Sequence, residues 1–401
     1  MNNQFTPTKT TNRIEILDGI RGLAVFGILL SNILIISGFY VTNYDILENM
    51  HLAKLNYGIF MFSFYAIIGK GYPIFCLLFG ISFYMQYQKY NDGDKSFIKF
   101  YLWRMLLLFI IGVMHVFIWP GDVVHYYAII SIFLIPLRKL DARKILIVSI
   151  ALFVISISIG LSGQFMNKQE HTEQEERVAS YQFEGVTYFE LKDKVQNEGI
   201  QGMWFFNKQQ YKLLYSIERF KTSVMWVLAL FLLGIFLYVK ELITKKMYNW
   251  KYLVSFLIIG LSGKALALMV SYHLRIIEHV FLSLFVISLF GIIYKSKLGN
   301  KLLSFFNPVG RMAFTNYVLQ SILASLIFYG IGLGLFTEIP LYGIYLISFA
   351  ILGFQTIFSV YWLRKFRFGP IEWLWRTLTY NKNFKLKNAK QYKTKVQLSW
   401  K

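Results

Sequence analysis

The sequence predicts an all-α protein that crosses a membrane several times. The chain has 401 residues, of which 56% are hydrophobic and only 16% are charged, and its mean hydropathy is +0.48. Apolar stretches close to the roughly twenty residues that a helix needs to cross a bilayer recur along the whole chain. These observations predict a polytopic bundle of about ten transmembrane helices.

The expected membrane helices are joined by short connections, apart from one long connection in the middle. The first apolar stretch is too long for the core of a signal peptide and no small-residue cleavage site follows it, so we expect it in the mature protein. Residues 55–67 are also apolar, and they either lie in the membrane interface or belong to a spanning segment. The expected spans are residues 20–40, 68–88, 99–119, 122–138, 143–163, 219–240, 252–272, 277–295, 312–337 and 341–363.

The distribution of basic residues predicts the orientation of these helices. Lysine and arginine gather in every second connection and in the C-terminal segment, and connections of this kind lie on the cytoplasmic side. We therefore expect both termini in the cytoplasm. The expected parts are N-terminal transmembrane helices (1–163), an extracellular loop (164–218), C-terminal transmembrane helices (219–363), and a cytoplasmic interfacial helix with a basic tail (364–401).

The formal net charge of +21 does not indicate a nucleic-acid-binding protein. The basic residues are divided among short connections and a tail beside membrane helices, and attraction to anionic lipids explains this arrangement. We expect membrane lipids as partners and no nucleic acid, and the sequence leaves a homodimer open. Cys76 is the single cysteine, which excludes an intramolecular disulfide. The sequence contains no P-loop and no HExxH helix, so we expect no metal site.

Charged and amide side chains mark the first span. Asp18 and Arg21 stand at its beginning and Asn32 lies inside it. A bilayer tolerates such groups mainly where they pair or line a cavity. The three polar residues of the first span therefore indicate a reaction chamber or a transport path. The structural alternative is that Asp18 and Arg21 form an ion pair three residues apart at the cytoplasmic end of the helix.

A second group of candidate residues surrounds a tight turn between the third and fourth spans. His115 precedes the turn at 119–121, and Asp122 and His125 follow it. The turn holds one acid and two imidazoles close together whatever the tertiary fold. Histidine changes its charge near neutral pH and suits acid–base chemistry. The structural alternative is that Asp122 caps the fourth span.

Charged residues also occur around the connection between the seventh and eighth spans. Arg275 and Glu278 are expected to pair three residues apart, with His273 and His279 beside them. Lys264 lies inside the seventh span, where an unpaired ammonium is costly. We therefore expect Lys264 to meet a carboxylate or to line an aqueous path.

Five strings in the sequence resemble the YeiB family of bacterial membrane proteins. The resemblance runs from about Arg13 to Tyr380, and more remotely the DxxRG motif at Asp18 is similar to that of transmembrane acyltransferases, such as heparan-glucosamine acetyltransferase and the acyltransferase-3 type. The heparan enzyme has its catalytic histidine shortly after an asparagine of the first span. This chain departs from that pattern, because its first histidine is His51. The strings are LDGIRGLAVFGILLSNI, IFCLLFGISF, WRMLLLFIIGVMHVFIWPGDVVHYYAI, VGRMAFTNYVLQS and WLRKFRFGPIEWLWRTLTY.

The resemblance implies that the protein is a multi-pass protein of the bacterial plasma membrane. It also implies an enzymatic reaction, the transfer of an acyl group from cytosolic acetyl-CoA, or another acyl-CoA, to a glycan, lipid or small-molecule acceptor at the outer face. Such transfer needs a base and a donor to the oxyanion. The expected catalytic residues are His115, Asp122, His125 and Asn32, and those expected to meet the CoA are Asp18, Arg21, Arg104 and Arg311.

A secondary transporter or flippase for a small or amphipathic molecule is the alternative function. It would use the same polar groups inside the membrane to bind its cargo, namely Lys264, Asn32 and Gln355. Internal repeats with broken helices would favour transport, and the two halves show no convincing repeat.

Overall fold

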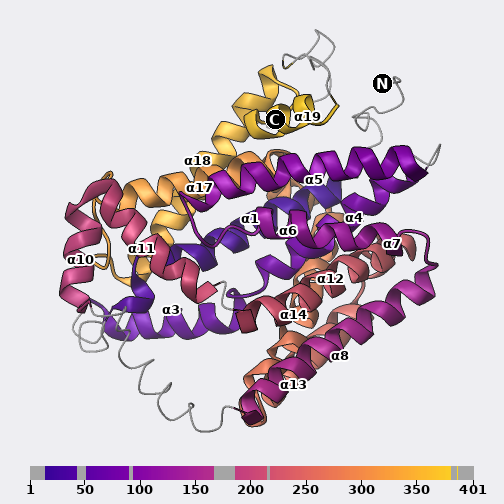
Figure 1. Ribbon diagram of the computed structural model, residues 1–401, viewed down its shortest axis with the longest axis horizontal. Helices are drawn as coiled ribbons and strands as arrows, with labels where there is room; N and C mark the ends of the chain where they lie inside the picture. The colour runs from indigo at the N-terminus through magenta and orange to yellow at the C-terminus, as the bar shows by residue number, and fades with distance from the viewer. Residues whose placement is uncertain are drawn as a thin grey trace.

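The computed structural model confirms the all-α class. It describes residues 14–42, 51–89, 94–166, 186–214, 217–380 and 386. Within these residues eight helical segments are long and apolar enough to cross a membrane, and two shorter apolar helices lie at Val124–Leu137 and Ala313–Phe328. Figure 1 shows these helices gathered into one bundle. The fold is therefore that of a membrane protein with many spans, as the composition predicts.

Eight long helices match eight of the expected spans to within a few residues. Each carries an apolar run of the required length, so local sequence alone determines it. They are α1 (Glu15–Ile36), α4 (Gly71–Lys89), α5 (Asp94–Val116), α8 (Ala142–Met166), α12 (Ile217–Val239), α13 (Trp250–Met269), α14 (Arg275–Lys295) and α18 (Leu341–Lys365).

The fourth expected span is a sequence of short helices. It comprises α6 (Val124–Ile130), a 3₁₀ turn at Ser131–Phe133 and α7 (Leu134–Leu137). The Ser131 hydroxyl donates a hydrogen bond to the carbonyl oxygen of Ala128 at 3.0 Å, beside the tightened turn. The segment is shorter than the span predicted at 122–138.

The ninth expected span is also shorter than predicted. Helix α17 (Ala313–Phe328) ends at Tyr329, and an irregular segment follows before α18 begins. The backbone N–H of Gly330 donates to the carbonyl of Val195 at 2.9 Å, and that of Thr337 donates to the carbonyl of Ser37 at 2.8 Å. Irregular backbone is tolerated at membrane depth where protein groups satisfy it. The prediction of a helix over 312–337 is therefore wrong in its second half.

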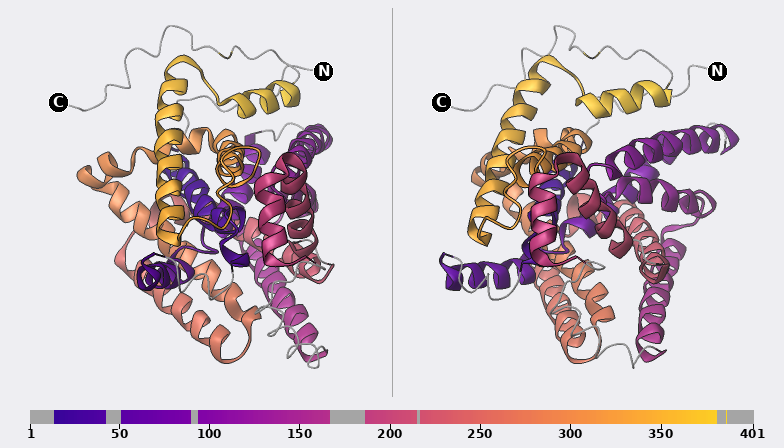
Figure 2. Two further views of the ribbon diagram at one scale, coloured as in Figure 1. Left: turned by 90° about the vertical axis from the view of Figure 1, so that its left-hand side faces the viewer. Right: turned by 60° about the vertical axis from the view of Figure 1, so that its left-hand side comes forward.

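Helix α3 (Ala53–Ala66) is separate from α4. Figure 2 shows α3 lying across the direction of α18, and its exposed side chains include Tyr57 and Phe62. Gly69 interrupts the helical conformation between α3 and α4. Its φ is +80°, a backbone conformation that favours glycine. This geometry favours the interfacial alternative for residues 55–67.

The long connection predicted at 164–218 contains two helices that pack into the protein. They are α10 (Tyr188–Asn197) and α11 (Gly199–Leu214). The Phe206 and Phe336 rings lie 5.0 Å apart, and Lys192 forms an ion pair with Glu338 at 2.6 Å. This half of the connection is thus part of the folded body. The acidic run before residue 186, with His171, lies outside the described residues.

Short helices complete the end of the molecule at which α1 begins. They are α15 (Lys297–Leu303), α16 (Phe306–Arg311) and α19 (Pro370–Tyr380). A Cβ on Gly22 would overlap the carbonyl oxygen of Phe306, and one on Gly310 would overlap that of Asp18. The glycine of the DxxRG motif therefore permits close packing of α16 on α1. Helix α19 confirms the helix expected after the last span, whereas the orientation in the membrane stays a prediction.

Candidate functional site

The tight turn between α5 and α6 brings the two expected histidines onto one carboxylate. His115 Nδ1 lies 2.9 Å from Asp122 Oδ1, and His125 Nδ1 lies 2.8 Å from Asp122 Oδ2. All three residues are buried, with exposed fractions of 2% for His115, 0% for Asp122 and 8% for His125. The sequence therefore predicted the contact correctly, because both histidines lie within seven residues of Asp122.

Asp122 stands one residue before Val123, the N-cap of α6, and still bonds the first turn of this helix. Its Oδ2 accepts a hydrogen bond from the backbone N–H of His125 in the first turn of α6, at 2.9 Å. A carboxylate that accepts hydrogen bonds holds the proton of a neutral imidazole on Nδ1 and leaves the Nε2 lone pair available. His115 Nε2 is buried and has no hydrogen-bond partner within the described residues. The arrangement can hold an imidazole base in one tautomer and orientation.

Asn32 is not joined to this cluster. It lies half-buried on α1 and makes no hydrogen bond in the part of the chain that the structure describes. Gln355, by contrast, donates to the backbone carbonyl of Asn316 at 2.6 Å, which ties α18 to α17. Interhelical bonding of this kind is a common use of amides in membranes. The structure does not unite Asn32, Gln355 and Lys264 in one cargo site.

The residues expected to meet the CoA gather at the end where α1 begins. Arg21 pairs with Asp18 at 2.7 Å, so the ion pair three residues apart is confirmed. Arg311 ends α16, which packs on the first turns of α1. Arg104 lies on α5 and contacts α19, with its guanidinium carbon 3.7 Å from the centre of the Trp375 ring. Helix α19 therefore covers Arg104.

Glu372 on α19 makes a capping contact that sequence reasoning missed. Its Oε1 accepts hydrogen bonds from the backbone N–H groups of Phe314 at 2.7 Å and Thr315 at 3.1 Å, and its Oε2 accepts one from the Thr315 hydroxyl. The carboxylate therefore caps the beginning of α17 from another helix. Burial raises the pKa of the Glu372 carboxyl above its ordinary value, although the Thr315 hydrogen bonds oppose this shift. A lone acid among aromatic residues was the only signal in the sequence.

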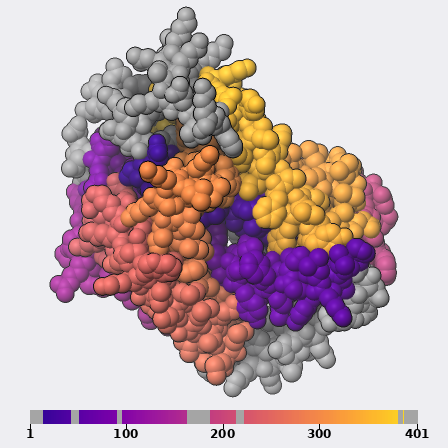
Figure 3. Space-filling model, turned by 180° about the vertical axis from the view of Figure 1, so that it is seen from behind, coloured from indigo at the N-terminus to yellow at the C-terminus, as the bar shows by residue number. Residues whose placement is uncertain are grey.

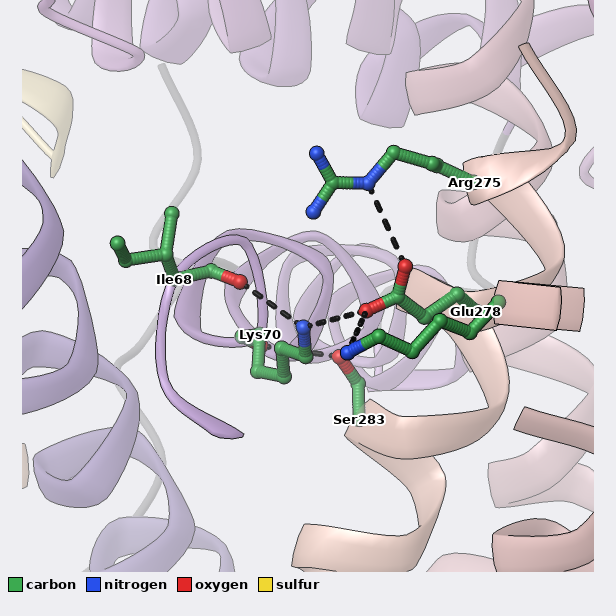
Figure 4. A network of polar contacts seen from close by, with 6 residues as sticks. Ile68, Lys70, Arg275, Glu278 and Ser283 are labelled. Carbon is green, nitrogen blue, oxygen red and sulfur yellow. Dashed lines mark hydrogen bonds and ion pairs between the residues drawn. The ribbon is translucent and has the colours of Figure 1, made fainter. Parts of the chain in front are cut away.

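A second buried cluster joins the residue before α4 to α13 and α14 in the second half of the chain (Figure 4). Lys70, just before α4, donates to Glu278 Oε1 at 2.9 Å. Arg275 Nε lies 3.4 Å from Glu278 Oε2, and Lys264 Nζ lies 3.8 Å from Glu278 Oε1. The predicted Arg275 and Glu278 pair is confirmed, and Lys264 meets a carboxylate as expected. The role of Lys70 was missed, because its partner is 208 positions away.

The other described histidines, His51, His273 and His279, have their contacts outside the His115 cluster. His279 packs beside Gly69, where a Cβ would overlap its ring, and His273 packs in the same way on Gly160 of α8. His51 is exposed and lies 3.3 Å from the Tyr342 hydroxyl. Within the described residues, no group of three or more histidine, cysteine, aspartate and glutamate residues is arranged to hold a metal ion.

Membrane-crossing helices around buried groups of charged residues define the class as a multi-pass integral membrane protein. Residues 211–382 match the family described as "Protein of unknown function (DUF418)". The chain is 31% identical over 393 residues to the uncharacterized protein YxaH of Bacillus subtilis (strain 168), covering 93% of this chain and 96% of YxaH. The chain therefore belongs to the DUF418 family, together with YxaH.

Two further relatives support this assignment. The chain is 26% identical over 392 residues to an uncharacterized 39.9 kDa protein in the amylase 3' region of Bacillus acidopullulyticus, with 94% of this chain and 97% of that protein covered. It is 47% identical over 73 residues to the uncharacterized protein YeiB of Escherichia coli (strain K12), which is 18% of each chain. The resemblance to the YeiB family is confirmed. No solved structure matches the chain.

Proposed function

We propose that the protein is a membrane acyltransferase of the bacterial plasma membrane. It transfers an acyl group from acetyl-CoA or another acyl-CoA to a glycan, lipid or small-molecule acceptor. The observation that supports this proposal is the contact of one buried carboxylate, Asp122, with the Nδ1 atoms of His115 and His125. A histidine oriented by a carboxylate is a general base that suits deprotonation of a hydroxyl or amine.

In the proposed reaction, His115 Nε2 takes the proton from the acceptor O–H or N–H group. The acceptor oxygen or nitrogen forms a bond to the thioester carbonyl carbon, and the C–S bond breaks. The leaving sulfur then receives the proton from the His115 imidazolium, so CoA departs as a thiol. Asp122 stabilises the imidazolium in between. Because His115 is only 2% exposed, the acceptor reaches it after a local opening of the helices.

Other residues have proposed roles in binding. Asn32, whose amide makes no hydrogen bond in the described part of α1, is the proposed donor to the thioester oxyanion. Arg21 and Arg311 are proposed to meet the CoA phosphates, with Asp18 holding Arg21 in place at 2.7 Å. Arg104 would join them once α19 moves away from it.

The test is acyl transfer in reconstituted proteoliposomes supplied with radiolabelled acetyl-CoA and an extract of bacterial envelope as acceptor. We expect label in the extract with the wild-type protein and none with His115→Ala. The matched control is His51→Ala, because His51 is exposed and apart from the cluster. Absence of label with the wild-type protein, or full transfer by both His115→Ala and His125→Ala, would overturn the assignment.

Transport is the second candidate function, and the cluster around Glu278 favours it. Buried ionisable groups in membrane helices commonly line ion or substrate pathways. The same proteoliposomes separate the two functions. A transporter moves its cargo across the membrane without acyl-CoA, whereas an acyltransferase forms product only when acyl-CoA is present.

A further inference from the structure

The charges around Glu278 do not balance within the described residues. Three cations, Lys70, Lys264 and Arg275, meet the single carboxylate of Glu278. The Lys70 and Glu278 side chains are 4% and 1% exposed, and those of Lys264 and Arg275 are 13% and 15% exposed. Buried charge is expensive unless it is paired. The cluster therefore holds more positive charge than its carboxylate neutralises.

The hydrogen-bond geometry shows which of the three cations have N–H donors that Glu278 does not use. Lys70 is committed, because it donates to both Glu278 and the carbonyl of Ile68. Lys264 Nζ is 3.8 Å from the carboxylate, beyond hydrogen-bond length. Arg275 uses only Nε, and its two terminal nitrogens point away from Glu278 in Figure 4. Lys264 and Arg275 are therefore the groups that can bind a ligand.

Aromatic rings offset part of the free-energy cost of burying Lys264 and Arg275. Lys264 Nζ lies 3.4 Å from the centre of the Tyr65 ring, and the Arg275 guanidinium carbon lies 4.7 Å from that of Phe64. A cation–π contact lowers the cost of burial but leaves the net charge unchanged. His279 Nδ1 is buried beside the cluster, against Gly69, with no hydrogen-bond partner in the described residues.

We propose that Lys264 and Arg275 bind an oxyanion of the phosphate type, with Lys70 holding Glu278 behind them. Arginine and lysine together are the usual ligands of phosphate, because they supply charge and several donors. Glu278 is the positioning residue that holds both cations. This site is separate from the histidine cluster and does not depend on acyl transfer.

The surroundings of the site suit the phosphate of an amphipathic molecule. Exposed apolar side chains lie at the end of α13 and on α3, among them Leu268, Met269 and Phe62. Figure 3 shows the purple surface of α3 beside the salmon and orange surface of the later helices on the back of the molecule. A phospholipid headgroup and free inorganic phosphate would present the same chemistry, so the experiment separates them.

The test measures thermal unfolding of the full-length protein in micelles of dodecyl maltoside, a detergent without phosphate. Inorganic phosphate is titrated at constant ionic strength against chloride, and in a second series phosphatidylglycerol is added to the micelles. We expect stabilisation in at least one series, with an apparent affinity roughly tenfold weaker in Lys264→Met. Stabilisation by phosphate identifies the free ion, and stabilisation by phosphatidylglycerol alone identifies the lipid.

The controls address folding and general salt effects. Lys251→Met removes an exposed lysine from the other end of α13, and it should respond as the wild type does. Lys264→Met should unfold without ligand at the wild-type temperature or above, because it removes unbalanced charge. If it does not fold, Arg275→Gln replaces it. Stabilisation in neither series, or equal stabilisation of Lys264→Met and Lys251→Met, would overturn the proposal.

Discussion

Glu372 binds Thr315 twice, accepting one hydrogen bond from its backbone N–H at 3.1 Å and one from its hydroxyl. The contact fixes the helix after the last span onto the first turn of α17. On the same helix, the Trp375 indole N–H donates to the backbone carbonyl of Arg104 at 3.2 Å. Helix α19 is therefore docked on two other helices, in addition to the interfacial location expected for it.

The first prediction concerns this docking. Glu372→Ala should lower the free energy of unfolding by about 1–3 kcal/mol, because two backbone N–H groups of α17 lose their acceptor. Thermal unfolding in detergent measures the change. Glu198→Ala is the control, since its ion pair with Lys194 is exposed and should contribute little. Equal effects of the two substitutions would contradict the capping role.

The pH dependence of stability should carry the signature of Glu372. Its pKa is raised in the folded protein, chiefly by burial, so the folded state binds this proton more tightly than the unfolded state. The resulting stabilisation is complete below the unfolded pKa and is lost as the pH rises through the folded pKa. The unfolding temperature of the wild type relative to Glu372→Gln should therefore fall as the pH rises above 4.5, the ordinary pKa of a glutamate. A constant difference would reject this.

Asp18 and Arg21 should be energetically coupled. Asp18 is 4% exposed, so removal of Arg21 leaves a buried carboxylate without its partner at 2.7 Å. Arg21→Met should destabilise the protein more than the double substitution with Asp18→Asn, with a coupling of roughly 0.5–3 kcal/mol. A double-mutant cycle of unfolding free energies measures it, and additive effects would exclude direct coupling.

Asp122→Asn should reduce acyl transfer by roughly a hundredfold or more, because it removes the acceptor that fixes the imidazole tautomer. The rate in proteoliposomes is compared with that of Asp141→Asn, which alters an exposed carboxylate. Unfolding temperatures separate lost chemistry from lost stability. Unchanged transfer by folded Asp122→Asn would refute the proposed role of the carboxylate.

The predicted orientation is tested by cysteine labelling of intact cells in a Cys76→Ala background. A cysteine at position 180, outside the described residues, should react with a membrane-impermeant reagent. One at position 141, in the exposed connection before α8, should react only after lysis. Labelling at 141 in intact cells would mean that the orientation is inverted.

Local sequence determined those parts of the structure that the sequence predicted. Eight helices follow from apolar runs alone, and the His115 and Asp122 contact follows from a turn that spans seven positions. The missed features depend on distant segments. Lys70 meets Glu278 across 208 positions, and Thr315 meets Glu372 across 57. Periodicity and spacing carry no information on which distant helices become neighbours.

The irregular segment at 329–340 has a consequence for how the protein is made. Two of its backbone N–H groups, those of Gly330 and Thr337, take their acceptors from Val195 and Ser37, both of which leave the ribosome earlier. Lipid offers no acceptors to such a segment. It can therefore reach its final form only after Ser37 and Val195 have both come into place beside it, which imposes an order of assembly on the newly inserted chain.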